Sequence, residues 1–141
     1  REFHALMDGA LDELSLHESY ALDLGIDLDA VDPYPETRSY TDFLLRTAWA
    51  SDVAELLAAT TPCMRLYAYL GQRLSAHGAP ENPYANWIAT YSSSGFEDLA
   101  TRIEALLDAV GDDVPRLQNV YRTALECELS FFSAPLEDRG A

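Results

Sequence analysis

The chain has 141 residues, of which 48% are hydrophobic, and this is enough for one domain with a buried core. Nine arginines, no lysine and 24 acidic residues give a formal net charge of −15, which argues against nucleic acid or an anionic membrane surface as a partner. With no run of about 18 apolar residues and no basic leader before an apolar stretch, we expect neither a membrane span nor a signal peptide, and therefore a cytoplasmic protein.

Apolar residues recur every three or four positions through nearly the whole chain, which is the period of an amphipathic helix. The first predicted helix ends near Gly25, because glycine readily adopts the left-handed conformation after a helix. Residues 29–38 are predicted as a loop, and Ser39–Asp42 is predicted to open the second helix as a capping box. Ser51 is predicted to cap the third helix, which contains Pro62 and should be kinked there.

The second half of the chain continues the helical pattern. A loop over 77–82 precedes a short helix that the dipeptide Asn82–Pro83 should cap. Residues 92–95 are predicted to break the chain before an amphipathic helix that ends at Gly111, and the last helix is predicted over 114–132. Because no stretch alternates with a period of two, the sequence predicts an all-α bundle without strands or repeats.

The last predicted helix carries a carboxylate where a core residue is due. Its inward stripe has spacings of four, three, four and three: Leu117, Tyr121, Ala124, Glu128 and Phe131. An unpaired buried carboxylate costs several kcal/mol, so the protein must pair it, protonate it or use it. The alternative is a frayed helix end near Pro135 that lets the carboxylate of Glu128 reach water.

Cys63 directly follows Pro62 on an inward helix face. A cysteine there is commonly a small core hydrophobe. However, a thiolate is a soft nucleophile, a proline kink opens space, and Tyr67 at i+4 brings a polar aromatic tip beside the sulfur. Tyr40, Tyr67 and Tyr91 all lie on apolar stripes, which are usually core. Together with the thiol and the carboxylate, they are what a pocket for a flat, nitrogen-bearing ring requires.

Three separated motifs occur in order: Thr61-Pro-Cys-Met-Arg-Leu-Tyr67, Asn82-Pro-Tyr-Ala-Asn-Trp-Ile-Ala-Thr-Tyr91 and Glu128-Leu-Ser-Phe-Phe132. Together with Ser39-Tyr40-Thr-Asp-Phe-Leu44, a weaker match, they resemble the TenA family, also called thiaminase II or aminopyrimidine aminohydrolase. The resemblance implies one domain over 1–141 with a haem-oxygenase-like helical bundle without haem, usually a homotetramer. That domain is N-terminally shortened to the last two-thirds of the usual one. The helices that supply an aspartate for the pyrimidine amino group have no counterpart here.

Carried over residue by residue, the resemblance implies roles for six side chains. Cys63 matches the family's nucleophile, which assigns the chain to the cysteine-bearing branch, and Glu128 matches its catalytic carboxylate. The residues that match its substrate-binding positions are Tyr40, Tyr67, Tyr91 and Phe131. Phe132 stands where the family often has tryptophan, and we expect the effect of that change to be small.

The implied enzyme hydrolyses 4-amino-5-aminomethyl-2-methylpyrimidine to hydroxymethylpyrimidine in thiamin salvage, with thiamin as a poorer substrate. We expect no cofactor or metal, because His4, His17 and His77 are isolated and the Glu-x-x-His motif of di-iron bundles is missing. A non-catalytic TenA-like binding or regulatory protein is the alternative. A cofactor-free oxidase of the same superfamily would need a basic pocket, against which the scarcity of inward-facing Arg and His argues.

Overall fold

The computed structural model describes residues 2–78 and 83–137, which contain helices and no strand. The predicted all-α fold is therefore confirmed. The chain divides into two compact units, Arg1–Pro33 and Tyr34–Ala141, and each is described by itself. The assignment of the whole chain to a single domain stays a prediction. None of the helices in the described part is long and apolar enough to cross a membrane.

The first unit contains α1 (Glu2–Asp23) and a short 3-10 helix, η1 (Leu28–Ala30). Gly25 follows α1 with φ of 68°, and its N–H donates to the Leu22 carbonyl at 3.1 Å. The next N–H, that of Ile26, donates to the Ala21 carbonyl at 2.8 Å. These two bonds form a Schellman motif, which requires the left-handed residue that glycine provides. The predicted end of the first helix near Gly25 is confirmed.

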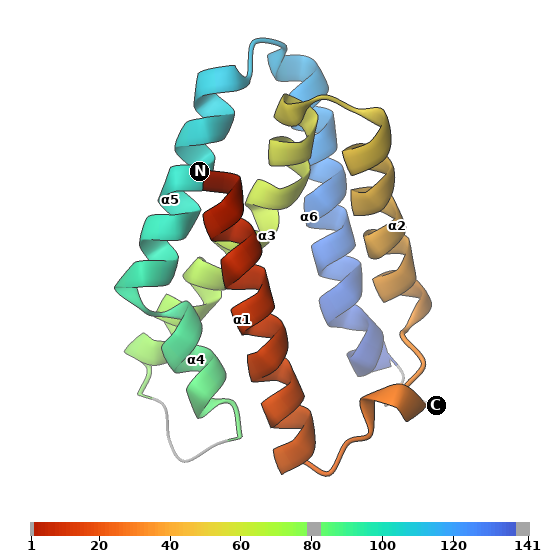
Figure 1. Ribbon diagram of the computed structural model, residues 1–141, viewed down its shortest axis with the longest axis vertical. Helices are drawn as coiled ribbons and strands as arrows, with labels where there is room; N and C mark the ends of the chain where they lie inside the picture. Colours follow the sequence, from red (N-terminus) through yellow and green to blue (C-terminus); the bar gives the residue numbers. More distant parts are fainter. Residues whose placement is uncertain (1, 79–82, 138–141) are drawn as a thin grey trace. The chain divides into compact units, whose positions relative to one another are not determined.

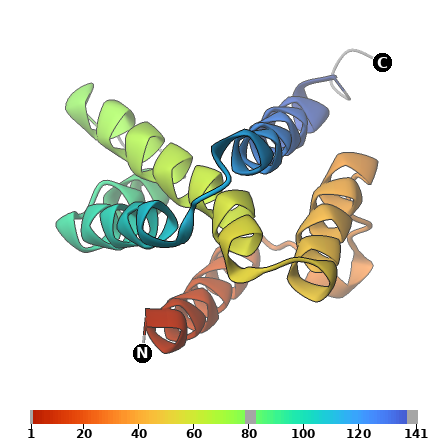
Figure 2. The same ribbon diagram turned by 90° about the horizontal axis from the view of Figure 1, so that it is seen from above.

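The second unit contains five helices (Figure 1), with these bounds: α2 (Pro35–Ala50), α3 (Val53–Ala76), α4 (Ala85–Tyr91), α5 (Ser94–Val110) and α6 (Val114–Glu137). Helix α3 packs against α2, α4, α5 and α6. Figure 2 shows α5 and α6 on opposite sides of α3. Residues on α3 are thus placed to meet side chains from every other helix of this unit.

Helix α2 begins four residues before the predicted start. The capping box at Ser39–Asp42 is wrong, since these residues lie inside the helix, and the loop predicted over 29–38 is shorter. Pro35 is the first helical residue. Proline suits that position because its fixed φ is helical and its missing N–H would have no partner there. Glu36 adds a favourable negative charge to the first turn.

Helix α3 is capped by Asp52 and not by Ser51. The Asp52 carboxylate accepts the N–H of Glu55 at 2.9 Å, whereas Ser51 ends α2. Aspartate and serine are equally good caps, so the sequence alone does not choose between neighbours. The helix continues through Pro62 to Ala76. A kink at that proline stays a prediction.

Two later boundaries also differ from the prediction. Helix α4 starts at Ala85, with Pro83 in the turn before it, while Asn82 lies outside the described residues. The predicted break at 92–95 is too long, because Ser93 Oγ already accepts the N–H of Phe96 and Gly95 lies within α5. Local caps therefore place both helix starts.

Two boundaries at the other end of the chain complete the second unit. Gly111 ends α5 as predicted, and its N–H donates to the Leu107 carbonyl at 2.8 Å. Helix α6 extends five residues past Phe132, to Glu137, with Pro135 inside it. The carboxyl end of α6 is thus more regular than the sequence indicated.

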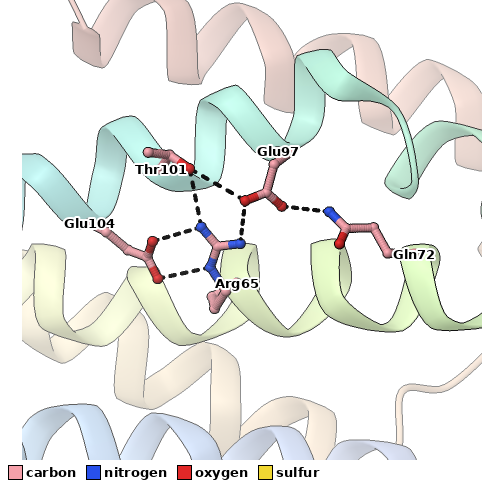
Figure 3. A network of polar contacts seen from close by, with 5 residues as sticks. All are labelled: Arg65, Gln72, Glu97, Thr101 and Glu104. Carbon is pink, nitrogen blue, oxygen red and sulfur yellow. Dashed lines mark hydrogen bonds and ion pairs between the residues drawn. The ribbon is translucent and has the colours of Figure 1, made fainter.

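An arginine-centred network ties α3 to α5 (Figure 3). Arg65 donates from Nε and Nη2 to the two oxygens of Glu104, at 2.8 and 2.6 Å, and from Nη1 to Glu97 at 2.7 Å. The amide of Gln72 donates to the other oxygen of Glu97 at 2.7 Å. Fork-like bonds of this kind constrain both distance and orientation. The network therefore fixes the segment of α3 that also carries the candidate thiol.

The start of α6 is held on the start of α3. Ala54, Ala58 and Leu117 form a buried apolar cluster. Arg116, next in sequence to Leu117, donates to Asp52 at 2.9 Å and to Glu55 at 3.0 Å. Because these contacts set the rotation of α6 about its own axis, the inward stripe that follows Leu117 along the helix faces the interior.

Candidate functional site

Glu128 is buried in α6 and paired with a residue of α2. Its side chain is 1% exposed, and Tyr40 Oη donates to its Oε1 at 2.7 Å. Leu117 and Ala124 of the same stripe are also buried, which confirms the predicted inward face. The alternative of a frayed end near Pro135 is wrong, since the helix continues past that residue and the carboxylate is enclosed.

The second oxygen of Glu128 is an orphan. Oε2 is buried and has no hydrogen-bond partner among residues 2–78 and 83–137. A buried polar atom in this state costs about 1–3 kcal/mol, and such atoms in native structures usually mark a functional position or a missing ligand. Glu128 thus offers one carboxylate oxygen that is already occupied and one that lacks a partner.

Tyr40 is fixed as a hydrogen-bond donor. Burial raises the pKa of its phenol well above the ordinary value, and the hydrogen bond to Glu128 and the nearby Cys63 thiol raise it further. The phenol therefore keeps its proton across the physiological range. Because it can only donate to the carboxylate, it holds Glu128 Oε1 and determines which oxygen remains for a ligand.

Cys63 lies on α3, half-buried, immediately after the buried Pro62. Its effect on the Tyr40 pKa indicates that the thiol is near the phenol, which in turn contacts Glu128. Three helices, α2, α3 and α6, therefore contribute Tyr40, Cys63 and Glu128 to one region. The predicted thiol and carboxylate share Tyr40 as a common neighbour.

Tyr67 lies at the centre of an aromatic cluster, one helical turn after Cys63. Its ring centroid is 4.9 Å from Tyr91, 5.6 Å from Trp87 and 5.8 Å from Phe132. These separations are typical of edge-to-face and tilted aromatic pairs. Residues from α3, α4 and α6 thus form a continuous set of rings.

Tyr91 is the most enclosed member of this cluster, with 1% of its surface exposed. Its ring contacts Trp87 at 4.6 Å and Phe96 at 4.8 Å. Its backbone lies against Gly71, where an added Cβ would be 2.4 Å from the Tyr91 carbonyl carbon. Glycine is therefore required on α3 for α4 to approach this closely.

Phe131 is half-buried and meets the cluster through its neighbour, since the rings of Phe131 and Phe132 are 5.4 Å apart. The sequence analysis did not assign Trp87 to the site, and it expected little effect from Phe132. Trp87 precedes Tyr91 by one helical turn, so the i, i+4 spacing of these two aromatic residues is the signal that would have found it.

The second cysteine faces a different space. Cys127 lines a groove of about 260 Å³ between α2 and α6, together with Ser39 and Glu126. Burial raises the pKa of its thiol, and the negative charges of Glu128 and Glu126 raise it further. A thiol with a raised pKa is a poor nucleophile at neutral pH, so Cys127 is a structural residue by this criterion. The two cysteines form no disulfide.

Metal-ligand side chains do not gather within the described ranges: no three His, Cys, Asp or Glu residues are placed there to hold an ion. His17 lies in α1 and His77 follows α3. The side chain of His4 is outside the described residues. The candidate chemistry thus comes from the thiol, the phenol and the carboxyl groups.

A helical bundle with a buried Glu–Tyr pair next to a thiol is the arrangement at this site. Residues 1–138 match the sequence model of the TENA/THI-4/PQQC family, and the chain belongs to this family. An aminopyrimidine aminohydrolase of Halalkalibacterium halodurans is 30% identical over 148 residues, which cover 97% of this chain and 66% of the relative.

Solved structures are similar as well. A protein from a Silicibacter species, described as a TenA family transcription regulator, has a TM-score of 0.78 and 28% identity over 88% of this chain and 61% of its own. A TenA homologue from Pyrococcus horikoshii has a TM-score of 0.80 and 25% identity over 89% of this chain and 62% of its own. The chain thus spans somewhat under two-thirds of the length of these proteins.

Proposed function

We propose that the protein hydrolyses 4-amino-5-aminomethyl-2-methylpyrimidine to the hydroxymethyl compound, releasing ammonia, as a thiamin-salvage enzyme. The observation that carries the proposal is the Glu128 carboxyl group, buried, held on one oxygen by Tyr40 and unpartnered on the other. A ring nitrogen of a bound pyrimidine would supply the missing partner. The aminohydrolase of H. halodurans, 30% identical, supports the same reaction class.

The proposed reaction begins with attack of the Cys63 thiolate on the ring carbon next to the aminomethyl-bearing carbon, forming a C–S bond. Glu128 donates its proton to a ring nitrogen, which takes up the displaced electron pair. The ring nitrogen then returns its electrons as the protonated amine leaves the methylene carbon. Water adds at that carbon, the proton returns to Glu128, and the C–S bond breaks to restore the thiolate.

Thiamin is a second substrate under this proposal, since its thiazolium is also a leaving group on the same methylene carbon. The substrate ring is expected to lie against the cluster of Tyr67 and Tyr91. Stacking on aromatic side chains suits a flat heterocycle, and the hydroxyls offer hydrogen bonds to its amino group. Phe131 and Tyr40 are expected to complete this binding surface.

Replacing Cys63 tests the nucleophile. We expect Cys63→Ala to abolish ammonia release from the aminopyrimidine while the protein remains folded, because no C–S bond can form. The measurement is coupled detection of ammonia on the full-length protein, with circular dichroism as the folding control. Cys127→Ala is the matched variant, since that thiol faces the α2–α6 groove, and it should keep normal turnover. Equal turnover in Cys63→Ala and in the unchanged protein would falsify the proposal.

Replacing Glu128 tests the proton donor. Glu128→Gln keeps the size of the side chain and an acceptor for Tyr40 but removes the acidic proton, so we expect turnover to fall by about 100-fold or more. Pyrimidine binding, measured by calorimetry, should persist. Glu126→Gln is the control, because that residue is exposed on the same helix. Similar rates in the two glutamine variants would exclude Glu128 from the chemistry.

The second candidate function is a non-catalytic binding or regulatory role. It is favoured by the Silicibacter protein, 28% identical and described as a transcription regulator. Under this alternative the pyrimidine would bind and no ammonia would appear. The calorimetric and ammonia measurements on the same preparation therefore separate the two functions.

A further inference from the structure

Three aromatic rings form a closed triangle beside the proposed site. Trp87 lies 5.6 Å from Tyr67 and 4.6 Å from Tyr91, while Tyr67 and Tyr91 are themselves 4.9 Å apart. Trp87 and Tyr91 come from α4, and Tyr67 comes from α3. Since each ring touches both of the others, none can rotate without displacing its neighbours.

The triangle is anchored at both ends. Phe96 of α5 packs against Tyr91 at 4.8 Å, and Phe132 of α6 packs against Tyr67 at 5.8 Å. Tyr91 is 1% exposed, whereas Trp87 and Tyr67 are half-buried. The rings that remain accessible to a ligand are therefore supported from behind by an immobile one.

We propose that Trp87 is a positioning residue, which holds the rings of Tyr67 and Tyr91 in the orientation that receives the substrate ring. The inference rests on the proposed function, because it concerns the same pocket. Its physical basis is preorganisation: an aromatic face that is already ordered costs no side-chain entropy when the ligand binds. Trp87 acts through the two tyrosines and takes no part in bond making at Cys63.

Two substitutions separate positioning from general packing. Trp87→Leu keeps an apolar side chain but removes the ring, and two lost aromatic pairs should raise KM about tenfold with kcat changed by less than about twofold. Trp87→Phe restores a ring and should recover most of the lost affinity. Melting temperatures of both variants are measured alongside. An unchanged KM in Trp87→Leu, or a loss of kcat that tracks the melting temperature without rescue by phenylalanine, overturns the inference.

A fluorescence measurement tests the inference without turnover. The chain has two tryptophans, and Trp49 is 88% exposed on α2. In a Trp49→Phe background Trp87 is therefore the sole tryptophan, and titration with the aminopyrimidine should change its emission in a saturable way. Cys63→Ala is included so that the ligand is not consumed.

The outcomes distinguish the two proposals. Turnover without an emission change overturns the role of Trp87 and leaves the aminohydrolase proposal standing. A saturable emission change without ammonia release from the Trp49→Phe protein overturns the catalytic proposal and supports the placement of Trp87 at the binding surface. Absence of both signals overturns both.

Discussion

Tyr40 determines the state of Glu128 because it is the donor to one oxygen of a carboxylate that is 1% exposed. Tyr40→Phe would leave both oxygens of that carboxylate without this donor. We expect it to lower the free energy of unfolding by about 1–3 kcal/mol, the usual cost of an unsatisfied buried group. Urea denaturation followed by circular dichroism measures the change.

Tyr20→Phe is the matched control for this prediction. The Tyr20 hydroxyl is buried and has no hydrogen-bond partner among the described residues, so its removal should leave stability unchanged or slightly higher. Equal losses in the two phenylalanine variants would contradict the assigned role of the Tyr40 hydrogen bond.

The inward position of Glu128 was predictable, and its partner was not. Helical spacing from Leu117 places Glu128 on the buried stripe, because the period of a helix is local. Tyr40 precedes Glu128 by 88 residues, and no spacing rule links two helices whose packing is decided by the whole core. Trp87 escaped for a different reason: an aromatic residue on an apolar stripe is usually core, and its contacts with two tyrosines emerge only in three dimensions.

At the scale of elements, the approach of α4 to α3 depends on Gly71. Gly71→Ala would place a Cβ 2.4 Å from the Tyr91 carbonyl carbon, and a backbone atom cannot move aside as a flexible side chain can. We expect the helices to separate, with a loss of about 1–3 kcal/mol in stability. Thermal unfolding measures the loss, and a rise in KM should accompany it because Tyr91 moves.

Gly95→Ala is the control for the Gly71 prediction. No atom lies within 4 Å of a Cβ built at Gly95, which is near the start of α5. Alanine has the higher helix propensity, so this change should be neutral or stabilising by up to about 1 kcal/mol. A loss in Gly95→Ala as large as that in Gly71→Ala would exclude the steric explanation.

The acid sensitivity of the α3–α5 contact follows from Arg65. Its hydrogen bond holds the pKa of Glu97 below the ordinary value. A carboxyl whose pKa is lowered by folding contributes stability above its unfolded pKa, about 4.3, and loses it as the pH falls through the folded value. We therefore expect the difference in melting temperature between the unchanged protein and Arg65→Met to shrink as the pH falls from about 7 to below about 4. A constant difference across that range would contradict this account.

Helix existence could be predicted from the sequence, and helix boundaries only in part. Gly25 and Gly111 end α1 and α5 as expected, because a glycine after an amphipathic segment has few alternatives. The starts of α2 and α3 were misplaced because two adequate caps stand close together in each case. Which of them is used depends on where the packed helix must begin, and Pro35 and Asp52 are chosen by that tertiary requirement.

At the scale of the whole molecule, the charge is strongly unbalanced, with 24 acidic residues against nine arginines. Repulsion among the excess carboxylates opposes compaction. Salt weakens that repulsion, and it also weakens the ion pairs of Arg65 and Arg116. Since the unpaired carboxylates outnumber the paired ones, we expect the melting temperature to rise as NaCl is increased from roughly 0.01 to 1 M, over which the Debye length falls from about 30 to 3 Å.

Calorimetric scans at constant pH measure the salt effect. Potassium chloride should act as sodium chloride does, because screening depends on ionic strength and not on the cation. A fall in melting temperature with salt would mean that the ion pairs, and not the excess charge, dominate the electrostatics. Assembly as a homotetramer stays a prediction, which light scattering measures on the same samples.

The central position of α3 also sets the order in which the second unit exchanges its amide hydrogens with solvent. Four helices cover α3, so its N–H groups become accessible only when several interfaces separate together, and this is the opening of highest free energy. The seven residues of α4 lean on fewer neighbours and should exchange through a smaller, local opening. Cys63 therefore sits in the last helix to open, while two of the three rings of the aromatic triangle belong to one of the first.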